Sequence, residues 1–194
     1  MVVIRSLALG AALAAAACAP RPPSSAATTT AADVAAVPLD APGGPTTLGA
    51  ELGAAPITVV TFFSAHCPCQ RVHDPALRAL YTRYAGRGVR FVAIDSEPDA
   101  SPQRAAAEVE ARGYPFPLLV DPGGRARDAL GARYATYTVV FASGRVRYSG
   151  GIDSARTHVD ETTTPFVDEA LADLVAGRDP RRAEGKVLGC ALER

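Results

Sequence analysis

The chain has 194 residues, of which 48% are hydrophobic and 21% are charged. This composition allows one domain with a buried core and excludes a fibrous or wholly disordered protein. Twenty basic residues balance twenty acidic residues, so no overall positive field favours nucleic acid, and we expect no nucleic-acid partner.

The amino terminus has the features of an export signal. Arg5 precedes a small apolar run, Ser6 to Ala17, which is too short to span a bilayer as a permanent helix. Small residues then precede Cys18, a pattern that resembles the bacterial lipobox, in which the cysteine is lipidated. The resemblance implies a signal peptide over residues 1–17 and a lipid anchor on Cys18. Ala19 after the cysteine favours an outer-membrane lipoprotein that faces the periplasm, and ordinary cleavage nearby, with Cys18 left as a thiol, is the alternative.

The segment that follows differs in composition from the rest of the chain. Residues 18–36 are rich in Pro, Ser, Thr and Ala, and such a segment buries too little apolar surface to fold alone. We therefore predict a flexible tether over residues 18–36 and one folded domain over residues 37–194.

Strands and helices alternate in the first half of this domain. A β-branched and aromatic run over 57–63 indicates a buried central strand. A loop with two cysteines leads directly into a helix that runs to Tyr84, because apolar residues recur there at helical spacing. A strand over 89–94, a helix over 102–112 and a strand over 117–120 complete a βαβαβ order.

The second half adds a hairpin and a last helix. A short helix is expected over 125–131, and strands over 138–141 and 146–148 flank a turn. Residues 165–176 are predicted to form the final helix. This order predicts an α/β fold with a central mixed β-sheet flanked by helices on both faces.

Five stretches of the domain carry a resemblance to known proteins. They are Phe62–Pro68, Arg87–Asp95, Tyr114–Asp121, Gly144–Asp153 and Gly189-Cys190. With a cysteine between the first buried strand and its helix, they resemble the thioredoxin-like redoxin-domain proteins, related to alkyl hydroperoxide reductase and thiol-disulfide oxidoreductases. The resemblance implies the thioredoxin-like fold and an oxidoreductase that acts on protein thiols and disulfides, exchanges electrons with a partner redox protein and needs no bound organic cofactor.

Two positions depart from the pattern of these relatives. The second cysteine comes one residue early, which gives Cys67-Pro68-Cys69. Thr136-Tyr137 occupies the place where the family usually has a Thr-Pro pair with a cis proline that faces the cysteine. A cis bond before tyrosine costs about 3–4 kcal/mol, so we expect a trans bond here and a different substrate groove.

The cysteines are the candidate catalytic residues. Cys67 is the candidate nucleophile, because unpaired N–H groups at a helix N-terminus stabilise the thiolate that attacks disulfides. Cys69 and Cys190 are both candidate resolving thiols, since a Cys67–Cys69 bond closes a strained, easily reduced ring and Cys190 can return to the site. A structural disulfide to Cys190 is also compatible with an oxidising compartment. The sequence leaves the pairing of these three cysteines open.

Two other activities are compatible with the same motif. The cysteines offer soft sulfur ligands for Cu(I) or Zn, and His66 and His73 beside them offer imidazole ligands. Sco-type copper chaperones, which the chain resembles in layout, use a distant histidine, a role that His158 could fill. The second alternative is a thiol peroxidase that acts through Cys67, where Ser64 fits the peroxiredoxin pattern. Our main prediction, a thiol-disulfide oxidoreductase, assigns no metal ligand.

Two aspartates follow strand-like runs in the sequence. Asp95 and Asp153 lie where sheets of this kind place functional sites. We interpret both as caps of turns or helices rather than as catalytic groups.

Overall fold

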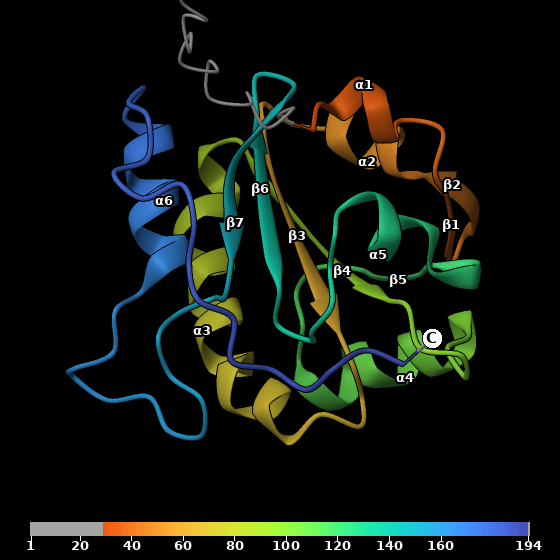
Figure 1. The fold of residues 1–194 in the computed structure, drawn as a ribbon. Coiled ribbons are helices and arrows are strands. Elements are labelled where there is room, and N and C mark those ends of the chain that lie inside the picture. Colours follow the sequence, from red (N-terminus) through yellow and green to blue (C-terminus); the bar gives the residue numbers. More distant parts are fainter. Residues whose placement is uncertain (1–28, 194) are drawn as a thin grey trace, which may run out of the picture.

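The computed structural model describes residues 29–193, in which strands and helices alternate around one sheet (Figure 1). The helices are α1 (Ala31–Val34), α2 (Leu48–Gly53), α3 (Pro68–Tyr84), α4 (Pro102–Arg112), α5 (Arg125–Ala129) and α6 (Phe166–Val175), with the 3-10 turns η1 (Ala85–Arg87) and η2 (Pro122–Gly124). The strands are β1 (Pro38–Ala41), β2 (Gly44–Thr47), β3 (Ile57–Phe63), β4 (Val89–Asp95), β5 (Leu118–Val120), β6 (Thr138–Ala142) and β7 (Arg145–Gly150). None of these helices is long and apolar enough to cross a membrane.

The seven strands form one mixed sheet in the order β2-β1-β5-β4-β3-β6-β7. β3 pairs in parallel with β4 and antiparallel with β6, so Ile57 lies opposite both Val89 and Ala142. All seven residues of β3 are buried, because helices cover the sheet on both faces and neither face of this strand meets water. The predicted α/β fold with a mixed sheet flanked by helices is therefore confirmed.

Successive side chains of β3 point into two separate cores. Val59 and Phe63 belong to the core beneath α3, α4 and α6. Val60 and Phe62 belong to a second core on the opposite face, beneath α1, α2 and α5. This alternation follows from the two-residue period of a strand. The second core also contains Cys67, so the candidate site lies on the face that α5 covers.

Each strand and helix that we predicted from residue 57 onward is present, with ends shifted by a few residues. The β1–β2 hairpin and α2, which precede the central strand, were not predicted from the sequence. The two strands have four residues each and contain Pro38 and Pro45. Within sheets proline is confined to edge strands, bulges and the first residue of a strand, and Pro45 lies in the edge strand β2 while Pro38 begins β1. Strands this short carry little periodic signal.

The folded part begins earlier than the predicted boundary at residue 37. Thr30 caps α1 in a capping box with Asp33, and the Ala31 N–H donates to the Gly144 carbonyl at 2.9 Å. Val34 is only 2% exposed and packs in the second core. The last residues of the predicted tether are therefore part of the domain, whereas the predicted signal peptide and Cys18 lie outside the described residues.

Candidate functional site

The first cysteine of the motif lies where the central strand passes into its helix. β3 ends at Phe63, and Cys67 is the N-cap residue of α3. Pro68 follows at the first helical position, which suits proline because an N–H there has no intrahelical partner. The Cys67 side chain makes no capping hydrogen bond and is 2% exposed. Because Cys67 is the N-cap residue, its sulfur lies near the partly positive N-terminus of α3.

The structure brings the three candidate cysteines together. The sulfur atoms of Cys67, Cys69 and Cys190 all lie within 4.8 Å of one another, and all three are free thiols in this structure. The Cys190 N–H donates to the Cys67 sulfur at 3.4 Å. Desolvation and the neighbouring Cys67 thiol raise the pKa of Cys190 to about 12. Cys190 is therefore protonated at neutral pH, while its backbone supplies a donor to Cys67.

Cys190 reaches this place on the C-terminal segment, which we define as residues 183–193. The segment runs beside β7 and crosses the sheet near the end of β3 (Figure 1). The Ala135 N–H donates to the Cys190 carbonyl at 2.9 Å, and the Leu192 N–H donates to the Arg133 carbonyl at 3.0 Å. These two bonds form one antiparallel bridge with the chain that leads into β6. Backbone pairing therefore determines the position of the third thiol.

A glycine allows this close approach of the two backbones. A Cβ atom at Gly189 would lie 1.9 Å from the Ala135 carbonyl oxygen and 3.0 Å from Oγ1 of Thr136. A larger residue at Gly189 thus cannot occupy the observed position. The Gly189-Cys190 pair that contributed to the family resemblance is explained by this packing.

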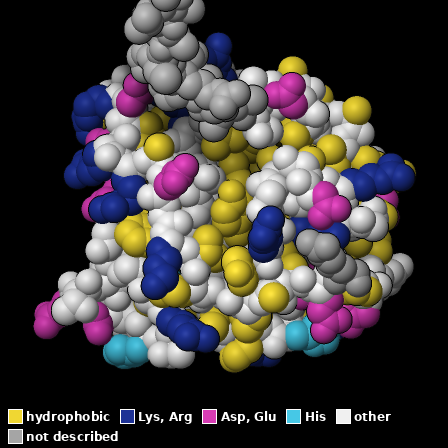
Figure 2. Space-filling model, in the orientation of Figure 1, with side chains coloured by type: hydrophobic (Ala, Val, Ile, Leu, Met, Phe, Trp, Pro, Cys, Tyr) yellow, Lys and Arg dark blue, Asp and Glu magenta, His cyan; other side chains and the backbone are white. Residues whose placement is uncertain are grey.

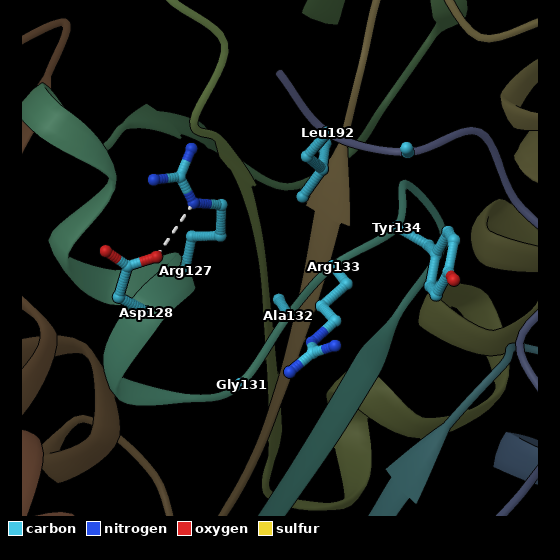
Figure 3. Close-up of a pocket in the computed structure, with 8 residues that line it drawn as sticks. Arg127, Asp128, Gly131, Ala132, Arg133, Tyr134 and Leu192 are labelled. Carbon is cyan, nitrogen blue, oxygen red and sulfur yellow. Dashed lines mark hydrogen bonds and ion pairs between the residues drawn. The ribbon is translucent and has the colours of Figure 1, made fainter. Parts of the chain in front are cut away.

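A pocket of about 370 Å³ lies beside the segment. Figure 3 shows Leu192 pointing from the segment toward the chain that carries Ala132 and Arg133. The pocket is lined by Arg127, Asp128, Gly131, Ala132, Arg133, Tyr134, Ala191 and Leu192. Figure 2 shows positive and negative side chains interspersed around a strip of hydrophobic atoms on this face of the molecule.

The backbone at Thr136-Tyr137 connects this region to the central strand. The expected trans bond is confirmed, since the described residues contain no cis peptide. Thr136 has a φ of 69°, a left-handed conformation that is rare for a β-branched residue. Its N–H donates to the Phe62 carbonyl at 2.7 Å, and the Phe62 N–H donates to the Tyr137 carbonyl at 2.8 Å. These bonds hold the bridge to the C-terminal segment close to the end of β3.

The histidines lie apart from the sulfur cluster. Within residues 29–193, no His, Asp or Glu joins the three sulfurs in a metal-sized group. His66 is exposed and its Nε2 lies 3.1 Å from Oδ2 of Asp99. His73 is buried and its Nδ1 lies 3.2 Å from Oδ2 of Asp153. The imidazole ligands of the copper alternative, including the exposed His158, are therefore not assembled with the cysteines.

The two strand-end aspartates act as caps, as we predicted. Asp95 accepts a hydrogen bond from the Glu97 N–H at 3.1 Å, and Asp153 accepts one from the Ala155 N–H at 2.8 Å. Burial raises the pKa of Asp95 to about 6. Ionisation of Asp95 at neutral pH therefore lowers the stability of the folded chain.

A buried polar network, which was not predicted from the sequence, supports the start of α3. Nε2 of Gln70 donates to the Tyr114 hydroxyl at 3.0 Å and to Oδ1 of Asp74 at 3.3 Å. A guanidinium nitrogen of Arg112 donates to Oδ2 of Asp74 at 2.8 Å. The same guanidinium lies 4.6 Å from the centre of the Phe63 ring. The network thus connects the residue after Cys69 to the end of β3.

Comparison with known proteins places this arrangement in a family. A family model described as Redoxin matches residues 26–164. The thiol-disulfide oxidoreductase ResA of Halalkalibacterium halodurans is 29% identical over 114 residues, which are 58% of this chain and 58% of the relative. The chain thus spans less than two thirds of the length of that curated relative.

Two solved structures are similar over most of their length. A hypothetical protein from Sinorhizobium meliloti 1021 is 30% identical with a TM-score of 0.74, over 85% of this chain and 92% of that one. An uncharacterized conserved protein from Geobacillus kaustophilus is 27% identical with a TM-score of 0.74, over 86% and 91%. The sheet, the cysteine at the start of α3 and the Redoxin match agree with the expected thioredoxin-like fold. The chain belongs to the Redoxin family.

Proposed function

We propose that the protein is a thiol-disulfide oxidoreductase whose nucleophile is Cys67. One observation carries the proposal: three thiols lie within 4.8 Å of one another where α3 begins. The helix N-terminus and the Cys190 N–H both favour negative charge on the Cys67 sulfur. Membership of the Redoxin family and the similarity to a thiol-disulfide oxidoreductase support the same chemistry.

The exchange takes place in two steps. The Cys67 thiolate attacks one sulfur of a substrate disulfide, that S–S bond breaks, and the other substrate sulfur leaves as a thiolate that takes up a proton. A second protein thiol then loses its proton and attacks the Cys67 sulfur. The reduced substrate is released, an internal disulfide remains, and the two electrons have passed from the protein to the substrate. A partner dithiol protein restores the reduced state by the same exchange.

We assign the second step to Cys190, with Cys69 as the other thiol in reach. Cys69 is the second residue of α3, so its backbone is fixed by the helix, and a bond to Cys67 would close a small strained ring. Cys190 lies on a separate segment, outside any helix, that is held near the site by the Tyr134–Ala191 bridge and by hydrogen bonds to Glu193. Its sulfur can therefore move toward Cys67 without unwinding the helix.

The experiment is a titration of the full chain against glutathione, with mass mapping of the cysteines that pair. It is made in a Cys18→Ser background, so that three thiols remain. The proposal predicts a reversible disulfide that contains Cys67, loss of disulfide reduction in Cys67→Ser, and a trapped mixed disulfide in Cys190→Ser. A Cys67 that stays free while Cys69 and Cys190 form a bond that glutathione does not reduce would contradict it.

We propose that this chemistry takes place outside the cytoplasm and that a lipid on Cys18 anchors the protein to the outer membrane. The apolar run and the lipobox-like residues before Cys18 support this location. Fractionation of cells that express the full chain tests it. The unsubstituted chain is expected with the outer membrane and Cys18→Ser in the soluble periplasmic fraction. An identical distribution of the two would refute the anchor.

A further inference from the structure

We propose that the reduced protein binds one Cu(I) ion through the three thiolates of Cys67, Cys69 and Cys190. This goes beyond the exchange of disulfides, because the same sulfurs act here as ligands rather than as nucleophiles. The two roles need different states of the site and can be tested independently.

The positions of the sulfurs suit a three-coordinate ion. No two of the three sulfur atoms are more than 4.8 Å apart. Metal–sulfur bonds of about 2.3 Å around a trigonal ion place the sulfurs about 4 Å from one another. The cluster therefore needs to contract by less than about 1 Å, a distance that rotation of cysteine side chains supplies.

The ligands approach the same point from two directions. Cys67 and Cys69 come from the beginning of α3, whereas Cys190 comes from the C-terminal segment. The hydrogen bond from the Cys190 N–H to the Cys67 sulfur already connects the two sides. Such outer donors to a ligating sulfur orient it and compensate part of its charge.

The donor set selects the ion. All three ligand atoms are soft sulfurs, and no carboxylate or imidazole of residues 29–193 joins them. Oxygen-preferring ions such as Mg²⁺, Ca²⁺ and Mn²⁺ are therefore disfavoured, whereas thiolates favour Cu(I) and Zn²⁺. Zinc takes four ligands and would need a water beside the three thiolates, which the apolar core around Cys67 and Cys69 disfavours. Cu(I) is satisfied by three thiolates, so it is the ion that fits.

The surroundings favour a bound cation. Cys67 is 2% exposed and Cys69 is 9% exposed, and both pack in the second core with Val60 and Phe62. Three neighbouring thiolates without a cation would repel one another in this apolar setting. One Cu(I) ion replaces three thiol protons, which are released on binding, and the cluster keeps a net charge of −2. The Cys190 N–H and the N-terminus of α3 compensate part of this charge. The apolar core then excludes water from one side of the ion.

Metal binding and disulfide formation exclude each other at this site. Any disulfide among the three cysteines removes two of the three ligands. The oxidised protein is therefore expected to release copper, and bound Cu(I) is expected to slow the oxidation of the thiols.

The test is an anaerobic titration of the reduced, chelator-washed full chain with Cu(I), again in the Cys18→Ser background, against the chromophoric competitor bicinchoninate. We expect one Cu(I) per chain and a fall in affinity of about 100-fold or more in Cys69→Ser and Cys190→Ser, since loss of even an outer partner of a metal ligand costs 10–100-fold. His66→Ala is the matched control: this exposed neighbour of Cys67 should leave the affinity unchanged.

A second measurement does not depend on any of these variants folding. X-ray absorption of the copper-loaded Cys18→Ser chain should show three sulfur neighbours and no nitrogen neighbour. Absence of retained Cu(I), retention that is equal in Cys190→Ser, loss of affinity in His66→Ala, or displacement of Cu(I) by equimolar Zn²⁺ would each overturn the proposal. The glutathione titration is made on metal-free protein, so failure of copper binding leaves the proposed oxidoreductase untouched.

Discussion

Replacement of Gly189 by alanine should detach the C-terminal segment from the site. The added Cβ would lie 1.9 Å from the Ala135 carbonyl oxygen, a separation that must lengthen to at least 3.0 Å. Ala135 cannot simply move away, because its N–H donates to the Cys190 carbonyl at 2.9 Å. The bridge between the two backbones must therefore break or shift.

The size of the effect follows from the cost of overpacking. Extra atoms in a well-packed position cost about 1–3 kcal/mol. Because 1.4 kcal/mol corresponds to a factor of ten, the population with Cys190 beside Cys67 should fall about 5- to 140-fold. The equilibrium constant for forming the Cys67–Cys190 disulfide from oxidised glutathione should fall by the same factor, because it depends on how often these two thiols lie side by side.

The assay uses a Cys18→Ser, Cys69→Ser background, so that one pair of thiols remains. Gly53→Ala is the control, because a Cβ at this residue meets no atom within 4 Å and its φ is not positive. The control should leave the equilibrium unchanged. A change below twofold in Gly189→Ala, or an equal change in both variants, would refute the role assigned to the segment.

Three further substitutions test other parts of the structure. Burial raises the pKa of Asp95 from 3.8 to about 6, so its penalty appears as pH rises above 3.8. Asp95→Asn should therefore raise the free energy of unfolding by about 2–3 kcal/mol at pH 7 and leave it nearly unchanged at pH 3; equal gains at both pH values in urea unfolding would contradict this. Asp74→Ala removes the buried carboxylate to which Arg112 and Tyr114 donate and leaves Arg112 with Glu108 as its remaining ion-pair partner, so it should cost about 3 kcal/mol, whereas the exposed Asp99→Ala should cost nothing measurable. Val34→Ala should lower stability by about 1–3 kcal/mol, and an unchanged stability would show that α1 does not pack on the domain.

The fold could be predicted where the sequence has a clear period. The run over β3 and the helical spacing in α3 were sufficient to place Cys67 at a helix N-terminus. The hairpin of β1 and β2 was missed because each strand has only four residues, and its stability comes from pairing with β5 and not from a local pattern. Thr30 was assigned to the tether because composition does not show a capping box with Asp33.

The site could be predicted in its residues but not in its arrangement. The three cysteines were identified by residue type, whereas Cys67 and Cys190 are separated by 123 positions and meet through backbone pairing with Ala135. Gly189 beside Cys190 was the available signal, since a glycine next to a functional residue often marks a close backbone approach. The network of Asp74 and Tyr114 joins residues 40 positions apart, and a single sequence contains no periodic trace of such a contact.

The long separation between Cys67 and Cys190 also affects how the site is made during synthesis. A ribosome adds about 5–20 residues per second, so the 123 positions between them take about 6–25 s to translate. Throughout that interval Cys67 and Cys69 can meet only each other among these three cysteines. An oxidant that reaches the chain while it emerges would therefore join the two nearest thiols first. Pairing with Cys190 then requires a later rearrangement, after β6 has formed and Ala135 is in place to receive the C-terminal segment.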